Sequence, residues 1–173
     1  MINIRYATAA DSRLLAEVGA ETFFDSFAAD NTPENMAAYL AAAFSPQKQR
    51  AELAAPNSRF FMAEVAGETA GFAQLKFGAT PAEVAGRQPV EIARLYARKA
   101  WIGRGIGAAL MARCLAEARA AGCDVIWLGV WERNPRAIEF YTKWGFAEVG
   151  AHIFQVGDDP QRDLLLARPV ELR

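Results

Sequence analysis

The seven residues from Val125 to Trp131, VIWLGVW, form an almost unbroken apolar run in the second half of the chain. A strand with this pattern is covered on both faces, which is typical of the centre of a sheet with helices packed on either side. Segments of strand and helix periodicity surround it in the order β α α β β β α β α β β, with one further short helix after the second. This order predicts a single mixed α/β domain over residues 1–173.

The other elements follow from hydrophobic periodicity and from capping and turn residues. Thr32-Pro33 and Asn134-Pro135 each place an N-cap residue before a Pro at the first helical position, and Asp11 or Ser12 can cap an earlier helix. Gly67-Glu68-Thr69 is expected to turn a hairpin. We expect strands at 2–7, 59–66, 70–77, 90–98, 125–131, 146–154 and 163–168, and helices at 11–27, 32–44, 46–53, 106–121 and 134–145.

Composition limits the classes of function. With 53% hydrophobic residues, 23% charged residues and a net charge of −1, the chain is globular rather than disordered. Its longest stretch without a charged residue, 35–47, has 13 residues, whereas a bilayer span needs about 20. The N-terminus lacks a secretory signal, so we expect a cytoplasmic protein without a membrane partner. Scattered basic residues disfavour nucleic acid, and Cys114, Cys123 and the single histidine predict reduced thiols and no metal site.

Charge is distributed unevenly along the chain. Residues 1–86 carry a net charge of −4 and residues 87–173 one of +3. Within the acidic part, Glu17, Glu21 and Asp25 recur every four residues and therefore line one face of the expected helix. The asymmetry is compatible with two ligands of opposite charge. Variation among solvated helix faces explains it equally simply.

A glycine-rich turn, Gly103-Arg104-Gly105-Ile106-Gly107, connects an expected strand to an expected helix. The first N–H groups of a helix have no internal partner, and glycines let the backbone approach an anion closely. A dinucleotide site would need an acidic residue at the end of the next strand, but Asp124 precedes that strand. A Walker-type phosphate loop is excluded, because Ala108-Ala109 stand where Lys-Ser/Thr is required. The turn is thus a candidate phosphate site, although a tight turn without ligand remains the alternative.

Two blocks of sequence resemble the GNAT superfamily of N-acetyltransferases. Residues 92–97 with the following turn at 102–107 are similar to that family's acetyl-CoA motif, and residues 134–146 (NPRAIEFYTKWGF) resemble its N-x-x-A-x-x-F-Y-x-K-x-G-F signature. A closer likeness is to PaiA-type spermine/spermidine acetyltransferases. It rests on residues 21–23, 31–36, 127–132, 150–152 and 157–158. Ile102 departs from the family pattern, which usually has Arg or Gln at that position.

The resemblance implies a GNAT fold in which the parallel strands 92–98 and 125–131 splay apart around the pantetheine arm of acetyl-CoA. The backbones of Leu95 and Ala97 would bond that arm, and the amide near Ala97 would polarise the thioester carbonyl. Residues 102–107 would hold the pyrophosphate, and Lys143 would reach a phosphate. The residues implied to bind acetyl-CoA are Leu95, Tyr96, Ala97, Ile102, Gly103, Arg104, Gly105, Ile106, Gly107, Asn134 and Lys143.

The resemblance also implies catalytic roles. Tyr141 matches the family tyrosine that protonates the departing thiolate, and a phenol pKa near 10 suits a thiol whose pKa is about 8.5. Glu91 is the candidate base, although a salt bridge to Arg94 explains it as well. The single histidine, His152, is expected to be a strand residue near the mouth of the cleft rather than a base.

The expected acceptor is a small-molecule primary amine, with a polyamine as the specific hypothesis. Its candidate binding residues are Glu21, Phe24, Asp25 and Tyr39. The alternatives are another small amine, a protein N-terminus, or a non-catalytic acyl-CoA-binding regulator, and the chain can be a monomer or a homodimer.

Overall fold

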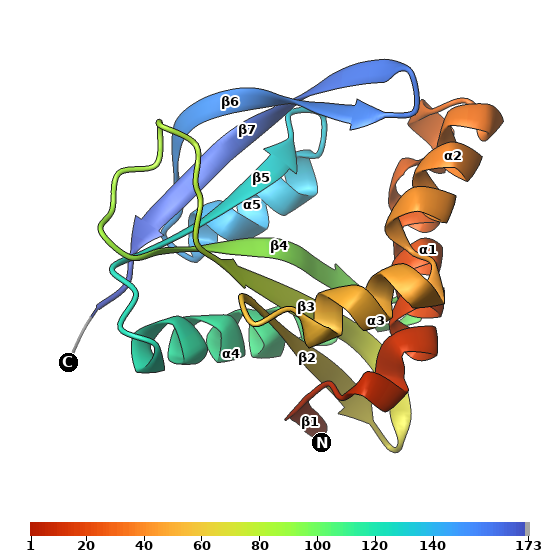
Figure 1. Ribbon diagram of the computed structural model, residues 1–173, viewed down its shortest axis with the longest axis horizontal. Coiled ribbons are helices and arrows are strands. Elements are labelled where there is room, and N and C mark those ends of the chain that lie inside the picture. Colours follow the sequence, from red (N-terminus) through yellow and green to blue (C-terminus); the bar gives the residue numbers. More distant parts are fainter. Residues whose placement is uncertain (172–173) are drawn as a thin grey trace.

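A computed structural model describes residues 1–171 (Figure 1). Seven strands form one sheet in the order β1-β2-β3-β4-β5-β7-β6, in which only the β4–β5 pair is parallel. The strands are β1 (Ile2–Tyr6), β2 (Ser58–Val65), β3 (Glu68–Phe77), β4 (Pro89–Ala97), β5 (Val125–Trp131), β6 (Ala147–Val156) and β7 (Asp159–Pro169). The helices are α1 (Ser12–Phe27), α2 (Pro33–Ala43), α3 (Pro46–Ala54), α4 (Ile106–Ala120) and α5 (Pro135–Lys143), with short 3-10 turns at Ala9–Asp11, Ala28–Asp30 and Lys99–Trp101. The mixed single-domain α/β fold predicted from the sequence is confirmed.

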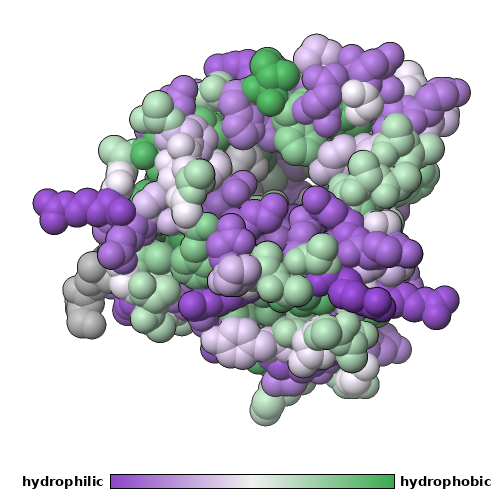
Figure 2. All heavy atoms as spheres, viewed as in Figure 1, coloured by the Kyte–Doolittle hydropathy of each residue, from purple (hydrophilic) through white to green (hydrophobic). Residues whose placement is uncertain are grey.

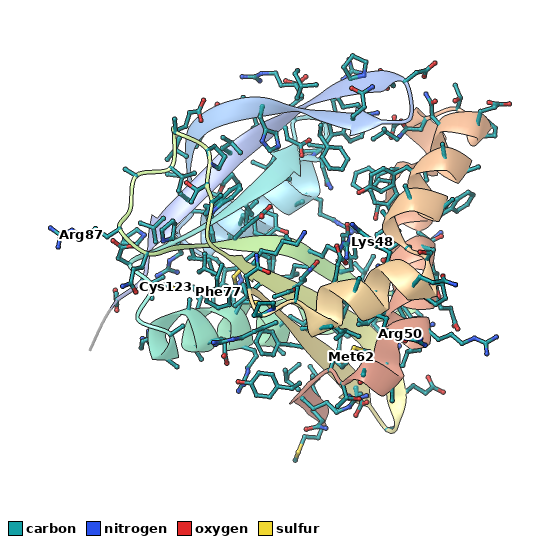
Figure 3. The ribbon with its side chains drawn as sticks, in the orientation of Figure 1. Lys48, Arg50, Met62, Phe77, Arg87 and Cys123 are labelled. Atoms are coloured by element: carbon teal, nitrogen blue, oxygen red, sulfur yellow. The ribbon has the colours of Figure 1, made fainter. Side chains whose placement is uncertain are left out.

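Helices cover both faces of the sheet. On β2, Phe61 and Ala63 belong to a core shared with α4, whereas Phe60 and Met62 belong to a second core that contains Leu15 of α1. This division follows from the two-residue period of a strand, which sends successive side chains to opposite faces. In Figure 3 the labelled Met62 lies inside the fold near α1, whereas Arg87 extends away from the protein. The alternating apolar residues of β2 thus anchor both helical layers.

Several details differ from the sequence expectations. The β2–β3 hairpin turns at Ala66 (φ 52°) and Gly67 (φ 85°) instead of at 67–69, because two successive positive φ angles already reverse the chain. Strand β7 begins at Asp159, four residues early, since Pro160 is paired opposite Gln155 rather than lying in a loop. The predicted cap of α1 is wrong: Asp11 makes no capping hydrogen bond there. Its carboxylate instead accepts hydrogen bonds from the Thr8 N–H and from Arg5.

The parallel pair β4–β5 opens after only three residue pairs. Its last pair is Glu91 with Trp127, while β3 continues alongside β4 as far as Ala97. At the point of divergence the β3–β4 register shifts, so that Ala93 has no partner on β3. A bulge of this kind bends the strand that carries it. The bend at Ala93 directs the rest of β4 away from β5, and Figure 1 shows the two strands separating.

Figure 2 shows polar and apolar side chains mixed over one face, with the surface hollowed between the β6–β7 hairpin and α3. Among the helices of residues 1–171, none combines the length and the apolar composition needed to cross a membrane.

The side chains that line the gap between β4 and β5 define the main candidate site.

Candidate active site

A cleft of about 510 Å³ occupies the gap between β4 and β5. The diverging strands form its two walls, α1 and α5 flank it, and β6 and β7 close one end. Residues 92–97 of β4 line it, and the edge of this segment that faces β5 has no strand partner. Unpaired backbone N–H and C=O groups on such an edge are available to an extended ligand. The cleft connects the glycine turn at one end to the side chains of Gln161 and Asp163 at the other.

The glycine turn presents its backbone to the cleft. Gly103 and Gly105 have φ angles of 78° and 85°, which only glycine adopts without strain, and both line the cleft. Among residues 1–171 neither of their N–H groups has a backbone partner, whereas the Arg104 N–H donates to Trp101 O at 3.2 Å. The Arg104 guanidinium lies over the Trp101 ring, 5.4 Å from its centroid, and is not a cleft-lining residue.

Two isoleucines flank this turn in different ways. Ile102 is 41% exposed and lines the cleft, so the position of the family's usual Arg or Gln carries an apolar side chain here. Ile106 is buried in the core beside α4, which leaves only its backbone for a ligand. Gly107 also lines the cleft, so at Ile102 and Gly107 the turn offers a ligand backbone polar groups but no polar side chain.

Leu95, Tyr96 and Ala97 lie together on the cleft wall of β4. The Tyr96 ring packs edge-on against Phe72, with ring centroids 5.5 Å apart, and burial raises the pKa of its hydroxyl. On the opposite wall, Gly129 and Trp131 of β5 line the cleft. The predicted pantetheine-binding segment is therefore accessible along its unpaired edge.

Three residues of the predicted site, Asn134, Tyr141 and Lys143, lie on α5 or directly before it. Asn134 accepts a hydrogen bond from the Ala137 N–H, so it caps the helix, and it also lines the cleft. Tyr141 lines the cleft between Phe140 and Phe146, and burial raises the pKa of its hydroxyl above the usual value. Lys143 is exposed and pairs with Glu139 of the same helix at 2.6 Å, outside the lining of the cleft.

The predicted acceptor-binding residues are not gathered in one place. Glu21 lies 3.1 Å from Arg98 Nε, and the same guanidinium also pairs with Glu17. Phe24 is 52% exposed, and Tyr39 stacks on Phe23 with ring centroids 4.2 Å apart; neither lines the main cleft. Asp25 lines a smaller adjoining cavity of about 280 Å³ that also contains Lys99 and Arg136.

Glu91 lies on the part of β4 that is still paired with β5, and it does not line the cleft. Burial raises the pKa of its carboxyl, while Lys76 and Arg94 act in the opposite direction. The anticipated salt bridge to Arg94 is absent from residues 1–171, because that guanidinium pairs with Glu52 of α3 at 2.6 Å. The base role of Glu91 therefore stays a prediction.

The far end of the cleft contains residues that the sequence reasoning missed. Phe27, Trp131 and Phe154 provide three aromatic rings there, and Phe27 and Trp131 meet edge to face with centroids 5.9 Å apart. Asp163 is the only acidic side chain that lines the cleft within residues 1–171, and burial raises the pKa of its carboxyl to about 6. Its position on the same face of β7 as Gln161 and Leu165 was the available signal, but that pattern does not show that Asp163 faces a cavity rather than solvent.

A sheet split between two parallel strands, with a glycine turn at the start of the following helix, defines an acyltransferase-type fold and site. Residues 21–146 match the acetyltransferase (GNAT) family, and the chain belongs to it as a GNAT-family N-acetyltransferase. It is 38% identical to an uncharacterized N-acetyltransferase of Lactobacillus delbrueckii subsp. lactis, over 87% of each chain. It is 32% identical to an uncharacterized N-acetyltransferase of Mycobacterium tuberculosis, over 91% of this chain and 97% of the relative.

Solved structures share this fold. A PaiA N-acetyltransferase from Thermoplasma acidophilum, in complex with coenzyme A, superposes with a TM-score of 0.78 at 21% identity, over 98% of this chain and 99% of that one. The ribosomal-protein-S18-alanine N-acetyltransferase of Escherichia coli gives a TM-score of 0.73 at 16% identity, over 100% of this chain and 96% of that one.

Proposed function

We propose that this protein transfers an acetyl group from acetyl-CoA to a cationic primary amine by direct attack of the amine on the thioester. One observation carries the proposal: a single cleft joins a backbone phosphate site, an unpaired strand edge, a buried tyrosine and a carboxylate. The first two features suit coenzyme A, the tyrosine suits protonation of its departing thiolate, and the carboxylate suits an amine acceptor. The PaiA relative, which is in complex with coenzyme A, supports the choice of donor.

The residues around the cleft fit coenzyme A. Gly103 and Gly105 offer backbone N–H groups without a backbone partner among the described residues, next to the N-terminus of α4, where the helix dipole favours a diphosphate. The free edge at Leu95 and Ala97 suits the amide groups of an extended pantetheine arm. When bound, acetyl-CoA supplies the activated acyl group. Lys143 would contribute to phosphate binding only if its ammonium left the ion pair with Glu139 and bound a phosphate of the ligand instead.

Tyr141 is the proposed general acid. Burial raises the pKa of its hydroxyl, so the phenol stays protonated at every physiological pH. Transfer of its proton to a thiolate is by itself unfavourable, because a thiol pKa is about 8.5. The proton lost by the newly acylated nitrogen replaces the one that Tyr141 gives up, which makes the complete exchange favourable.

The polyamine hypothesis takes Asp25 as its second contact, because this carboxylate lines the smaller cavity beside the cleft, although Lys99 and Arg136 line the same cavity and oppose a further ammonium. Glu17 and Glu21 contribute less than their number implies, because both pair with Arg98, whose single positive charge offsets one of their two negative charges. We therefore place the reacting ammonium in the cleft and a second ammonium of the acceptor near Asp25. This arrangement favours a diamine or polyamine over a monoamine.

Release of coenzyme A, measured with spermidine and with propylamine at 20 mM and 500 mM salt, tests the proposal. We expect kcat/KM for spermidine to be at least tenfold higher at low salt and to approach the propylamine value at high salt, because salt screens exposed charges. Equal values at both salt concentrations would reject the polyamine preference. Absence of coenzyme A binding in calorimetry would reject the acetyltransferase assignment itself.

A further inference from the structure

Asp163 is a buried carboxylate that the fold leaves without a hydrogen bond. Asp163 as a whole residue is 8% exposed. Within residues 1–171, no N–H or O–H group donates a hydrogen bond to its carboxylate oxygens. The nearest basic side chain is that of His152, whose Nε2 lies 3.9 Å from Asp163 Oδ2, beyond hydrogen-bond distance. The carboxylate oxygens are not fully enclosed by protein atoms but are open to the cleft, where a cationic ligand would supply the partner that the fold does not. Because the side chain lines the cleft, that ligand enters through the cleft.

The surroundings of Asp163 indicate the chemistry of this ligand. Phe27, Trp131 and Phe154 line the same end of the cleft, and aromatic faces attract alkylammonium groups. Gly129, opposite on β5, keeps space open, because a Cβ there would lie 3.3 Å from Asp163 Oδ2 and 3.4 Å from His152 Nε2. One carboxylate, three aromatic rings and a glycine gap together suit a single ammonium group.

We propose that Asp163 binds the ammonium of the acceptor and removes one of its protons before attack, and that His152 passes this proton to solvent. This inference rests on the proposed function and assigns its base to β7. His152 is suited to the second step because its side chain is 38% exposed, whereas the side chain of Asp163 is 12% exposed. A rotation of the His152 side chain that brings Nε2 from 3.9 Å to hydrogen-bond distance of Asp163 Oδ2 would connect the closed end of the cleft to water.

The protons and electron pairs balance in this scheme. The ammonium nitrogen gives one proton to the Asp163 carboxylate, and its freed lone pair forms the new bond to the thioester carbon. The carbon–sulfur bond breaks and its electron pair leaves with sulfur. A second proton passes from nitrogen by way of the Tyr141 hydroxyl to that sulfur, and the third remains on the amide product. The proton on Asp163 leaves through His152, so one proton is released in each turnover.

The ionisation of Asp163 agrees with this role. Burial raises the pKa of its carboxyl to about 6, so the group is largely ionised at neutral pH and yet more basic than an exposed aspartate. The titratable groups around it are His152 on β6, Tyr96 on β4 and Tyr39 on α2, and the Asp163 charge raises the pKa of both tyrosines. Neither tyrosine ionises near neutrality, so the pH dependence that we attribute to this end of the cleft is that of the Asp163 carboxyl.

The test is the pH profile of kcat/KM for the wild type, Asp163→Asn and the control Glu148→Gln, an exposed residue of β6. Spermidine, propylamine and an alanyl peptide are tried as acceptors, and the faster of the two alkylamines is used for the profile, because the α-amino group of the peptide, with a pKa of about 8, is already neutral at pH 9. We expect the wild-type value to rise through pH 6 and then level. Asp163→Asn should fall at least 100-fold at pH 7 and then rise tenfold per pH unit up to pH 9, since only pre-neutralised amine reacts. Glu148→Gln should match the wild type.

A second measurement needs no substrate. The ¹³C chemical shifts of the side-chain carboxyl carbons in aspartate-labelled protein, followed against pH, should include one titration with a midpoint near 6 that is absent in Asp163→Asn. The proposal is overturned if Asp163→Asn binds coenzyme A but keeps kcat/KM within threefold at pH 7. If that variant does not fold, a wild-type profile that keeps rising tenfold per unit from pH 7 to 9 also overturns it. A wild type that binds coenzyme A but acetylates none of the three amines overturns the proposed function with it.

Discussion

The Nδ2 amide of Asn35 donates to Oδ1 of Asp158 at 2.7 Å, joining residues 123 positions apart. The Asp158 N–H returns a hydrogen bond to Asn35 Oδ1 at 3.2 Å. The contact is so close that a Cβ on Gly157 would lie 2.2 Å from Asn35 Oδ1. This pair fastens the start of α2 to the β6–β7 turn, next to the strand ends that close the cleft. Two of the sequence blocks that resemble PaiA proteins, 31–36 and 157–158, thus meet in space.

Removal of this contact should weaken binding of the acceptor. Asn35→Ala is expected to raise the KM for the amine about threefold to tenfold, because the released β6–β7 hairpin carries Phe154 at the acceptor end. The free energy of unfolding should fall by about 1 kcal/mol. Steady-state kinetics and urea denaturation measure the two effects. Asn57→Ala, which removes an exposed bond to Phe77 O, is the control, and an equal rise in KM in both variants would contradict the assignment.

Loss of the Tyr141 hydroxyl should slow turnover without impairing binding of the donor. Tyr141→Phe is expected to lower kcat by about 100-fold to 1,000-fold, as is typical of general acid catalysis. The Phe ring keeps the contacts with Phe140 and Phe146, so calorimetry should give an unchanged Kd for coenzyme A. Unchanged turnover would remove the acid role. If the wild type also lacked turnover, the chain would instead be an acyl-CoA-binding regulator.

The glycine turn can be tested with two glycines of equal φ angle. Gly105 and Gly67 both have a φ of 85°, so an alanine at either introduces the same strain, about 1 kcal/mol. Gly105→Ala should also weaken coenzyme A binding at least tenfold, because its Cβ obstructs the approach of a phosphate to the N–H groups. Gly67→Ala, in the β2–β3 turn, should lose stability only. Calorimetry and thermal denaturation distinguish the outcomes, and equal Kd values would exclude a phosphate site at this turn.

The ion pair between Arg5 and Asp11 should appear in acid unfolding. The Arg5 guanidinium and the Thr8 N–H hold the pKa of Asp11 at about 2, against an ordinary value of 3.8 for an aspartate, so the pair stabilises the fold above pH 4. Allowing for the partly exposed Arg5, this contribution is about 1–2 kcal/mol. Asp11→Asn should therefore be less stable than the wild type at pH 7.

Because the folded pKa of Asp11 is depressed, its contribution disappears as the pH falls from about 4 to 2. The stability difference between wild type and Asp11→Asn in urea should therefore shrink over that interval. Asp30→Asn, at an exposed position, serves as the control. A difference that stays constant from pH 7 to pH 2 would show that the loss in Asp11→Asn has another origin.

The sequence predicted the fold well because its signals are local. The caps at Thr32 and Asn134 accept hydrogen bonds from the backbone N–H three residues later, as their position before Pro indicates. Asp11 misled the prediction because a short carboxylate also bonds strand and turn groups, and Arg5 lies beside it only in the folded chain. Such competition between partners has no signature in the local sequence.

Residues that belong to a local motif could be placed at the cleft from the sequence. Residues whose position depends on contacts between distant segments could not. The glycine turn, Leu95, Ala97 and Tyr141 all line the cleft. By contrast, the spacing of Glu17 and Glu21 could not reveal that Arg98, more than 70 residues later, pairs with both. Asp163 escaped notice for the same reason, since its burial depends on strands β5 and β6 that flank it.

The bulge at Ala93 has a further consequence for the free protein. Because β4 and β5 share only three residue pairs, the sheet consists of two half-sheets joined at one end, and the inner edges beyond Glu91 have no strand partner. A bound extended ligand would serve as an additional strand in this seam. The two halves should therefore move relative to each other more freely in the empty protein, so that a donor that fills the seam also stiffens the molecule for the reaction.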